Sequence, residues 1–182
     1  MNLIKTKLDG LVVLKPTVFK DNRGYFMESY NQKNINKLFG NVNFVQDNES
    51  KSSRGVLRGL HFQKPPYTQA KLVRCLNGSV LDVVLDLRKD SKTYGMIETF
   101  LISEENKEQL FIPKGFAHGF VVISESATLS YKVDNYFNPE SESGIIWNDP
   151  DLNIDWKINK NEIIVSEKDK NLPTFNEIIN PF

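Results

Sequence analysis

The stretch RGVLRGLHFQKPPYTQAK, residues 54–71, holds the densest group of reactive side chains in the sequence. It contains His61, one of only two histidines in the 182-residue chain, preceded by two glycines and two arginines. The proline pair that follows His61 must turn the backbone before Lys71. This pattern predicts two β-strands joined by an irregular connection, so a β-rich fold is the first expectation.

Two interpretations of this stretch are open from the residue types alone. An imidazole at His61, an ammonium at Lys71 and guanidinium groups at Arg54 and Arg58 could together bind and deprotonate a small anionic substrate. The plainer alternative is a half-buried histidine on a strand with solvated basic neighbours, which is the usual position of a single histidine. Spacing does not choose between the two.

Outside this stretch, apolar residues recur in short runs separated by turn residues. The pair Asn77-Gly78, between the runs 71–76 and 80–87, predicts a β-hairpin. The second run alternates leucine and valine with Asp82 and Asp86, which predicts that one of its faces is in the core. Further strands are expected at residues 11–14, 97–102, 109–112, 119–123 and 128–133. Many short strands of this kind predict a sandwich or a barrel.

Helical periodicity is confined to residues 31–39, where Gly40 offers a stop. The preceding residues 24–30 alternate as a strand that would place Phe26 and Glu28 on one face. No internal repeat, low-complexity tract or shift in composition divides the chain. We therefore expect one domain spanning residues 1–182, since all-β domains often reach this length.

Charge and composition exclude several classes of function. Lysine plus arginine and aspartate plus glutamate balance at 23 each, so no overall field would attract nucleic acid or a membrane surface. The single cysteine, Cys75, lies in an apolar run and is expected to be buried rather than reactive. No apolar run is long enough for a signal peptide or a membrane span, which predicts a soluble, cytoplasmic protein.

The alternation of side chains along a strand predicts which candidate groups face the interior. In residues 128–133, Tyr131 shares a face with Leu129 and Val133, and in the strand that begins at Lys71 the lysine shares a face with Val73. Both polar groups are therefore expected to point inward. Taken alone, Tyr131 would be interpreted as an ordinary core tyrosine whose hydroxyl finds a partner.

Six segments along the chain together resemble one enzyme family. They are FVQDN (44–48), RGVLRGLHFQ with KLVRC (54–63 and 71–75), IPKGFAHGF (112–120), YKVDNYFNPESE (131–142), WND (147–149) and SEKD (166–169). In this order they are similar to motifs of the dTDP-4-dehydrorhamnose 3,5-epimerase family, and they cover nearly the whole chain. The resemblance implies an all-β, cupin-type double-stranded β-helix, or jelly roll, with a few short helices. Periodicity does not choose this fold over other β folds.

The activity that the resemblance implies is the inversion of C3 and C5 of dTDP-4-dehydro-6-deoxy-D-glucose, which yields dTDP-4-dehydro-L-rhamnose without a cofactor or a metal. The ketone at C4 acidifies the neighbouring C–H bonds, so the reaction needs a base, a cation at the carbonyl oxygen and an acid on the opposite face. By position, His61 would be the base, Lys71 would hold the enolate oxygen and Tyr131 would return the proton. Asp169 would orient the imidazole.

The resemblance also carries over a set of substrate contacts. They are Arg23, Phe26, Glu28, Gln46, Asn48, Arg58, Lys71, His118, Phe137, Glu142 and Lys168, with Arg58 and Lys168 expected near the diphosphate. One position departs from the family, which commonly has a tyrosine stacking on thymine where this chain has Phe137. Phenylalanine keeps the stacking and loses the hydroxyl contact, and Tyr136 is an alternative for that role.

Three alternatives stay open. The first is a C3-only epimerase of a related dTDP-4-keto sugar, since relatives with very similar sites invert only C3 or act on differently modified sugars. A metal-dependent cupin oxygenase is the second, although His61 belongs to no HxH motif and His118 lies far along the chain. The third, a non-catalytic binding protein, would not require a base and an acid together.

The resemblance further implies a homodimer in which the N-terminal strands around Phe26 and Glu28 exchange into the partner sheet.

Overall fold

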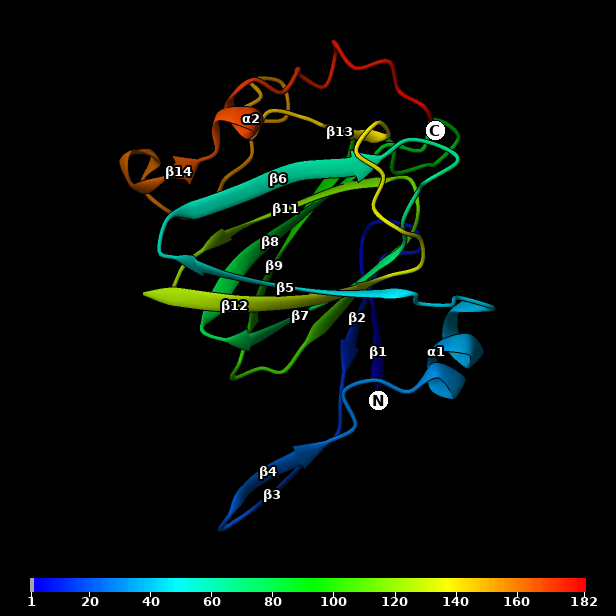
Figure 1. Cartoon of the computed structure of the whole chain (residues 1–182), viewed down its shortest axis with the longest axis vertical. Coiled ribbons are helices and arrows are strands. Elements are labelled where there is room, and N and C mark those ends of the chain that lie inside the picture. Colours follow the sequence, from blue (N-terminus) through cyan, green and yellow to red (C-terminus); the bar gives the residue numbers. More distant parts are fainter. Residues whose placement is uncertain (1) are drawn as a thin grey trace.

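The computed structural model describes residues 2–182 and consists mainly of two antiparallel β-sheets that face each other (Figure 1). The first sheet has the order β1 (Asn2–Lys5), β2 (Val12–Lys15), β10 (Gln109–Ile112), β7 (Lys71–Asn77), β12 (Ser126–Val133) and β5 (Gln46–Ser53). The second has the order β13 (Glu142–Gly144), β6 (Val56–Gln63), β11 (Phe116–Val122), β8 (Ser79–Asp86) and β9 (Ile97–Ser103), with β14 (Ile164–Val165) parallel to β6. This is the predicted cupin-type jelly roll.

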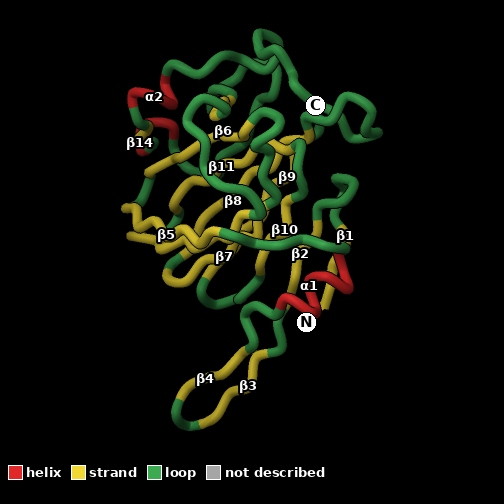
Figure 2. The backbone as a smooth tube through the Cα atoms, turned by 45° about the vertical axis from the view of Figure 1, so that its right-hand side comes forward, coloured by secondary structure: helices red, strands yellow, loops and turns green. Residues whose placement is uncertain are grey.

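Helices are few and short, as expected. Helix α1 (Gln32–Phe39) lies within the predicted residues 31–39, and α2 (Glu167–Lys170) and a 3-10 turn (Lys160–Glu162) follow late in the chain (Figure 2). Asn31 caps α1 by accepting a hydrogen bond from the Asn34 backbone, and Gly40 ends it with a φ of 75°. Among residues 2–182 no helix has the length and apolar character needed to cross a bilayer.

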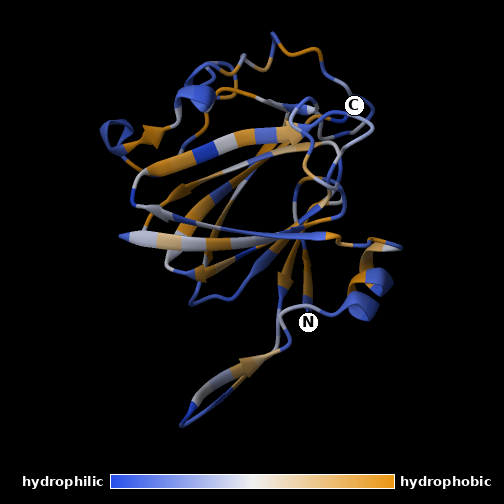
Figure 3. Cartoon of the chain, in the orientation of Figure 1, coloured by the Kyte–Doolittle hydropathy of each residue, from blue (hydrophilic) through white to orange (hydrophobic). Residues whose placement is uncertain are grey.

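Apolar side chains form three clusters, and Figure 3 shows hydrophobic colour on parts of many strands, whereas β5 is hydrophilic along its length. One cluster lies between the sheets and includes Val73, Val84 and Leu129. The second lies between the outer face of the second sheet and the C-terminal tail, and the third lies under α1. Cys75 is buried in the first cluster, as predicted, and burial raises the pKa of its thiol to about 11.

The predicted hairpin at Asn77-Gly78 is wrong. Strand β7 pairs with β10 and β12 in the first sheet, whereas β8 pairs with β11 and β9 in the second. The turn therefore carries the chain from one sheet to the other. Gly78 has a φ of 73°, which a glycine adopts without the steric cost that a side chain would add.

The core face predicted for the run 80–87 is confirmed, and the opposite face of β8 is buried as well. Leu81 and Leu85 pack toward the C-terminal tail, while Val84 belongs to the cluster between the sheets. Asp82 and Asp86, on the face opposite the leucines, are fully buried. The polar residues of this strand thus face protein on the side opposite the leucines.

A two-stranded arm, β3 (Val18–Asp21) and β4 (Gly24–Met27), projects away from the two sheets (Figure 1). The strand expected over residues 24–30 is shorter than predicted, since it ends at Met27. Phe26 is 68% exposed on this arm and stacks on Phe19, with 6.5 Å between the ring centroids.

Candidate active site

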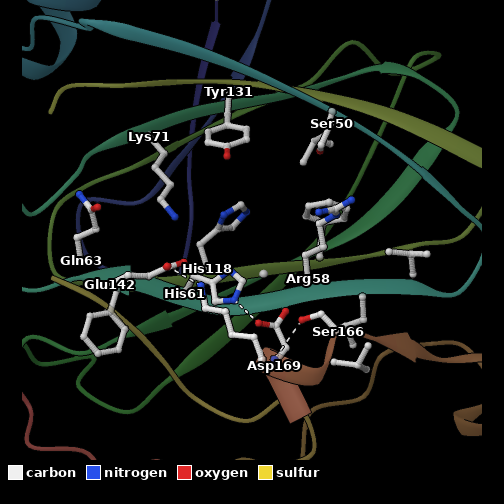
Figure 4. A pocket seen from close by; sticks show the side chains of 18 of the residues that line it. Ser50, Arg58, His61, Gln63, Lys71, His118, Tyr131, Glu142, Ser166 and Asp169 are labelled. Carbon is white, nitrogen blue, oxygen red and sulfur yellow. Dashed lines mark hydrogen bonds and ion pairs between the residues drawn. The ribbon is translucent and has the colours of Figure 1, made fainter. Parts of the chain in front are cut away.

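A cavity of about 540 Å³ opens between the two sheets and contains most of the predicted site residues. The side chains of Tyr131 from β12 and Lys71 from β7 enter from the first sheet. His61 from β6 and His118 from β11 enter from the second, where they are direct cross-strand neighbours (Figure 4). Residues separated by 70 positions in the sequence thus line opposite walls of one cavity.

Inward alternation explains why these side chains meet. Tyr131 and Leu129 share the buried face of β12, as Lys71 and Val73 do on β7, so the predicted orientation of both polar groups is confirmed. Gly59 in β6 and Gly119 in β11 pack against each other, and a Cβ on Gly59 would lie 2.5 Å from the Gly119 Cα atom. Glycine at both positions therefore allows the close approach of the two histidine-bearing strands.

His61 and Asp169 form a dyad. The Nε2 atom of His61 lies 2.7 Å from Oδ1 of Asp169, and Oδ2 of the same carboxylate accepts a hydrogen bond from the Gly59 backbone at 3.2 Å. Burial raises the pKa of Asp169, but its hydrogen bond to His61, the charge of His61, the Gly59 amide and Lys168 together bring that pKa below its ordinary value. An ionised Asp169 accepts a hydrogen bond from Nε2–H of His61, which leaves the lone pair of the imidazole on Nδ1.

A second dyad was missed by sequence reasoning. His118 Nε2 lies 3.0 and 2.9 Å from the two carboxylate oxygens of Asp82, and both residues are buried. The sequence pattern identified the leucine face of this strand as core and gave no prediction for the face that carries Asp82. Val80 and Val84 on the same face of β8 as Asp82 are the signal that could have identified it as buried.

Lys71 and Tyr131, the two polar groups that enter from the first sheet, have shifted pKa values. Burial lowers the pKa of Lys71 to about 8, against the opposing charges of Asp82 and Glu142. Burial raises the pKa of Tyr131, while Arg58 lowers it and Glu142 raises it further. Tyr131 is therefore a neutral hydroxyl at pH 7, and Lys71 is a cation that loses its proton near pH 8.

Basic and aromatic residues complete the lining. Arg58 is oriented from β5 by Ser52, whose hydroxyl accepts from Nε and Nη2 at 3.2 Å each. Lys168 and Glu142 form an ion pair of 2.5 Å, and Phe137 lies on the rim. Sequence reasoning did not identify four other polar residues of the lining, Ser50, Gln63, Gln69 and Ser166, because none has a distinctive chemical signature in the sequence.

Five predicted residues lie outside this lining. Gln46 and Asn48 on β5 bond each other at 2.8 Å, and Gln46 accepts a hydrogen bond from the Phe137 backbone, which places them near the rim. The remaining three, Arg23, Phe26 and Glu28, are on or beside the projecting arm; Arg23 pairs with Asp21 at 2.6 Å. The structure does not bring these three together with His61.

Arg54, the other arginine of the central stretch, does not line the cavity. It forms an ion pair of 2.9 Å with Glu162 and donates to the Ile123 carbonyl. Its expected role in binding an anion is therefore not supported. Among residues 2–182, no group of three or more histidine, cysteine, aspartate or glutamate side chains is arranged to hold a metal ion.

Comparison with known proteins agrees with this geometry. A family model described as dTDP-4-dehydrorhamnose 3,5-epimerase matches residues 5–177. The dTDP-4-dehydrorhamnose 3,5-epimerase of Escherichia coli K12 is 50% identical over 180 residues, which are 98% of this chain and 97% of the relative. The crystal structure of the Elizabethkingia anophelis enzyme of that name has a TM-score of 0.94 and 55% identity, covering 99% of this chain and 98% of that chain.

A third relative was crystallised with a ligand. The dTDP-6-deoxy-D-glucose-3,5-epimerase of Legionella pneumophila, in complex with dTDP-4-keto-L-rhamnose, has a TM-score of 0.93 and 46% identity. The similarity covers 97% of this chain and 94% of that chain. Together with the jelly roll and the cavity, these matches show that the chain belongs to the dTDP-4-dehydrorhamnose 3,5-epimerase family.

Proposed function

We propose that the chain inverts C3 and C5 of dTDP-4-dehydro-6-deoxy-D-glucose to form dTDP-4-dehydro-L-rhamnose, in dTDP-L-rhamnose biosynthesis. The ligand of the Legionella relative, dTDP-4-keto-L-rhamnose, is the product of this reaction. The observation that carries the proposal is the placement of His61 and Tyr131 on opposite walls of one cavity, with Lys71 on the wall of Tyr131 (Figure 4). A base and an acid on opposite sides of a bound sugar are what inversion requires.

His61 acts as the base. Its Nδ1 lone pair removes the proton from a carbon next to the C4 ketone, and the developing positive charge on the imidazole is stabilised by Asp169 at 2.7 Å. The negative charge that appears on the C4 oxygen is stabilised by the ammonium of Lys71. Loss of a group in this role typically lowers the rate by about 10²–10³-fold.

Tyr131 returns a proton to the opposite face of the enolate. Burial keeps the hydroxyl neutral at pH 7, so it holds a proton to donate. The tyrosinate that forms is stabilised by the positive charge of Arg58, which already lowers the pKa of Tyr131. Delivery from the side opposite His61 changes the configuration of the carbon.

The remaining predicted contacts bind the nucleotide. Arg58 and Lys168 provide positive charge for the diphosphate, and Phe137 provides a face for the thymine ring. Lys168 forms an ion pair with Glu142 in the free protein. The diphosphate therefore competes with the Glu142 carboxylate for the Lys168 ammonium. Phe137 is held near the rim through its backbone hydrogen bond to Gln46.

Incubation with dTDP-4-dehydro-6-deoxy-D-glucose in D₂O, followed by NMR, tests the activity. We expect deuterium to enter at both C3 and C5 with formation of the L-rhamno product. Exchange at C3 alone would assign the chain to the enzymes that invert one centre. Absence of exchange at either carbon would contradict the proposal.

The reaction as proposed uses no cofactor and no metal, because proton transfer and enolate stabilisation are assigned to side chains of the chain. Turnover should therefore survive exhaustive chelation. Loss of turnover that one specific metal restored would favour the oxygenase-like alternative.

We also propose that the chain works in the cytoplasm, as one domain spanning residues 1–182.

We further propose a homodimer. Strand β5 lies at the end of its sheet, so one edge of its backbone pairs with no other strand of residues 2–182 and can pair with a strand of a second copy. The projecting arm exposes Phe19, Tyr25 and Phe26, which are unfavourable in water and suited to contact a second copy. Exchange of arms would bring Arg23, Phe26 and Glu28 to the partner's cavity, which accounts for their distance from His61 in their own chain.

A further inference from the structure

The carboxylate of the His61 dyad is carried by a very short helix. Asp169 is the third residue of the four-residue α2, and Ser166 is the N-cap of that helix. The Ser166 hydroxyl accepts a hydrogen bond from the Asp169 backbone amide at 3.1 Å, and Figure 4 shows the two residues beside His61. A single helical turn has few internal hydrogen bonds, so its cap supplies a large part of what holds it.

The contacts of Asp169 divide into two kinds. Its carboxylate is held from outside, by His61 at 2.7 Å and by the Gly59 amide at 3.2 Å. Within the described residues its backbone amide bonds only to Ser166, since this amide occupies the first turn, where no intrahelical carbonyl is available. The position of the Asp169 main chain, from which the carboxylate reaches His61, therefore depends on the Ser166 hydroxyl.

We propose that Ser166 is a positioning residue for proton abstraction: its hydroxyl fixes the backbone of Asp169 and thereby the orientation of the His61 imidazole. Ser166 also lines the cavity, and the contact that its oxygen makes there is with the Asp169 amide, so the role assigned to it is exerted through Asp169. This inference rests on the proposed function, in which His61 is the base. It concerns a residue outside the expected catalytic and substrate-binding set.

Ser166→Ala removes the cap and leaves every charged group of the cavity in place. We expect kcat to fall by about three- to thirty-fold, the range that corresponds to loss of an N-cap, with KM changed by less than about two-fold. Deuterium exchange from solvent into the substrate should slow by the same factor, because proton removal is the impaired step. Ser166→Thr keeps a capping hydroxyl and should restore both rates.

A double-mutant cycle separates positioning from general loss of stability. If Ser166 acts through Asp169, Ser166→Ala should slow wild-type enzyme but cause no further loss in an Asp169→Ala background. Ser103→Ala is the matched control. The Ser103 hydroxyl accepts from the Asn106 amide, also three residues later and also at 3.1 Å, at the end of β9 and outside the cavity lining. This variant loses the same type of hydrogen bond and should retain the wild-type kcat.

Two results would overturn the inference: a kcat for Ser166→Ala equal to that of Ser103→Ala, or full additivity of Ser166→Ala with Asp169→Ala. Thermal unfolding of each variant in the same buffer shows that the comparison is made on folded protein. Failure of the proposed function looks different, because wild-type enzyme would then show no deuterium exchange at C3 or C5. Wild-type exchange together with an unaffected Ser166→Ala variant would reject the positioning role alone.

Discussion

Tyr131 and His61 approach the cavity from different sheets, so their contributions to catalysis can be separated. In Tyr131→Phe, proton removal by His61 and enolate stabilisation by Lys71 remain, while delivery of a proton to the opposite face is lost. We expect inversion to fall by about 10²–10⁴-fold, the usual contribution of a general acid. Label at C3 should still be lost to water, through return of a solvent proton by His61 to the original face.

The measurement is loss of deuterium from C3-labelled substrate together with the ratio of epimers, in Tyr131→Phe, His61→Ala and Asp169→Ala. His61→Ala should abolish exchange and inversion, and Asp169→Ala should weaken the two together. Equal suppression of exchange and inversion in Tyr131→Phe would mean that the hydroxyl is needed earlier, for binding or enolate formation.

The lowered pKa of Lys71 predicts that activity falls at alkaline pH. Burial lowers its pKa to about 8, so the ammonium that stabilises the enolate is lost as pH rises through that value. We expect kcat to decline above about pH 8 in wild-type enzyme. Lys71→Arg keeps a charge throughout this range, so its residual activity should lack the decline. An identical alkaline decline in both proteins would assign it to another group.

The same lysine affects stability in a defined direction. Its pKa is lower in the folded protein than the ordinary value of 10.5, so the unfolded chain binds more protons between these values. The cost of burying the charged form is present below about pH 8 and is relieved as pH rises toward 10.5. The difference in unfolding free energy between Lys71→Met and wild-type protein should therefore shrink over this interval.

Among the elements, β14 determines where Asp169 lies. Its two residues run parallel to the start of β6, and Ile164 donates a hydrogen bond of 2.9 Å to the Gly55 carbonyl. Gly55 has a φ of 81°, and a side-chain carbon there would collide with the Glu162 carbonyl. A residue with a side chain at position 55 would thus push β14, and α2 behind it, away from β6.

Gly55→Ala should lower both stability and activity, the latter by about ten-fold or more because a displacement of α2 separates Asp169 from His61. Gly40→Ala is the matched control: its φ is 75°, and nothing lies within 4 Å of the added carbon. Both substitutions place a side chain at a positive φ, where it is strained, and only the one at position 55 adds a collision with backbone atoms. Similar melting temperatures and similar kcat values in the two variants would contradict the assigned role of β14.

Across the assembled protein, the proposed arm exchange predicts complementation between two defective chains. Arg23→Ala would impair the partner's cavity, whereas His61→Ala would impair its own. Mixed dimers would then contain one cavity with an intact base and an intact arm. Mixing the two variants under conditions that allow subunit exchange should restore activity well above the sum of the separate proteins.

Sedimentation at assay concentration supplies the independent measurement, and a dimer is expected. Full activity from a monomer would refute the exchange, as would complementation no greater than the sum of the two variants. Substitution of Phe26 by aspartate should weaken the dimer, because it places a charge in the apolar surface of the arm.

Local patterns of the sequence were sufficient to predict the helix α1 and the direction of two site residues. The bounds of α1 follow from Asn31 and Gly40, and the inward direction of Tyr131 and Lys71 follows from strand alternation. These features depend on neighbours within a few positions, so they are visible in the order of residues. The fold family and the four expected catalytic positions came from extended similarity of motifs rather than from periodicity.

Only the tertiary structure determined which strands pair and which faces of the strands pack against each other. A turn such as Asn77-Gly78 reverses the chain but does not determine which strand pairs with which, and here it joins two sheets. Alternation along β8 shows which residues share a face but does not show what covers that face. The burial of Asp82 and its hydrogen bond to His118 were therefore not predicted. Ser166 acquires its role only because β14 lies along β6, and hydrogen bonds between such distant segments depend on packing that no short window of sequence contains.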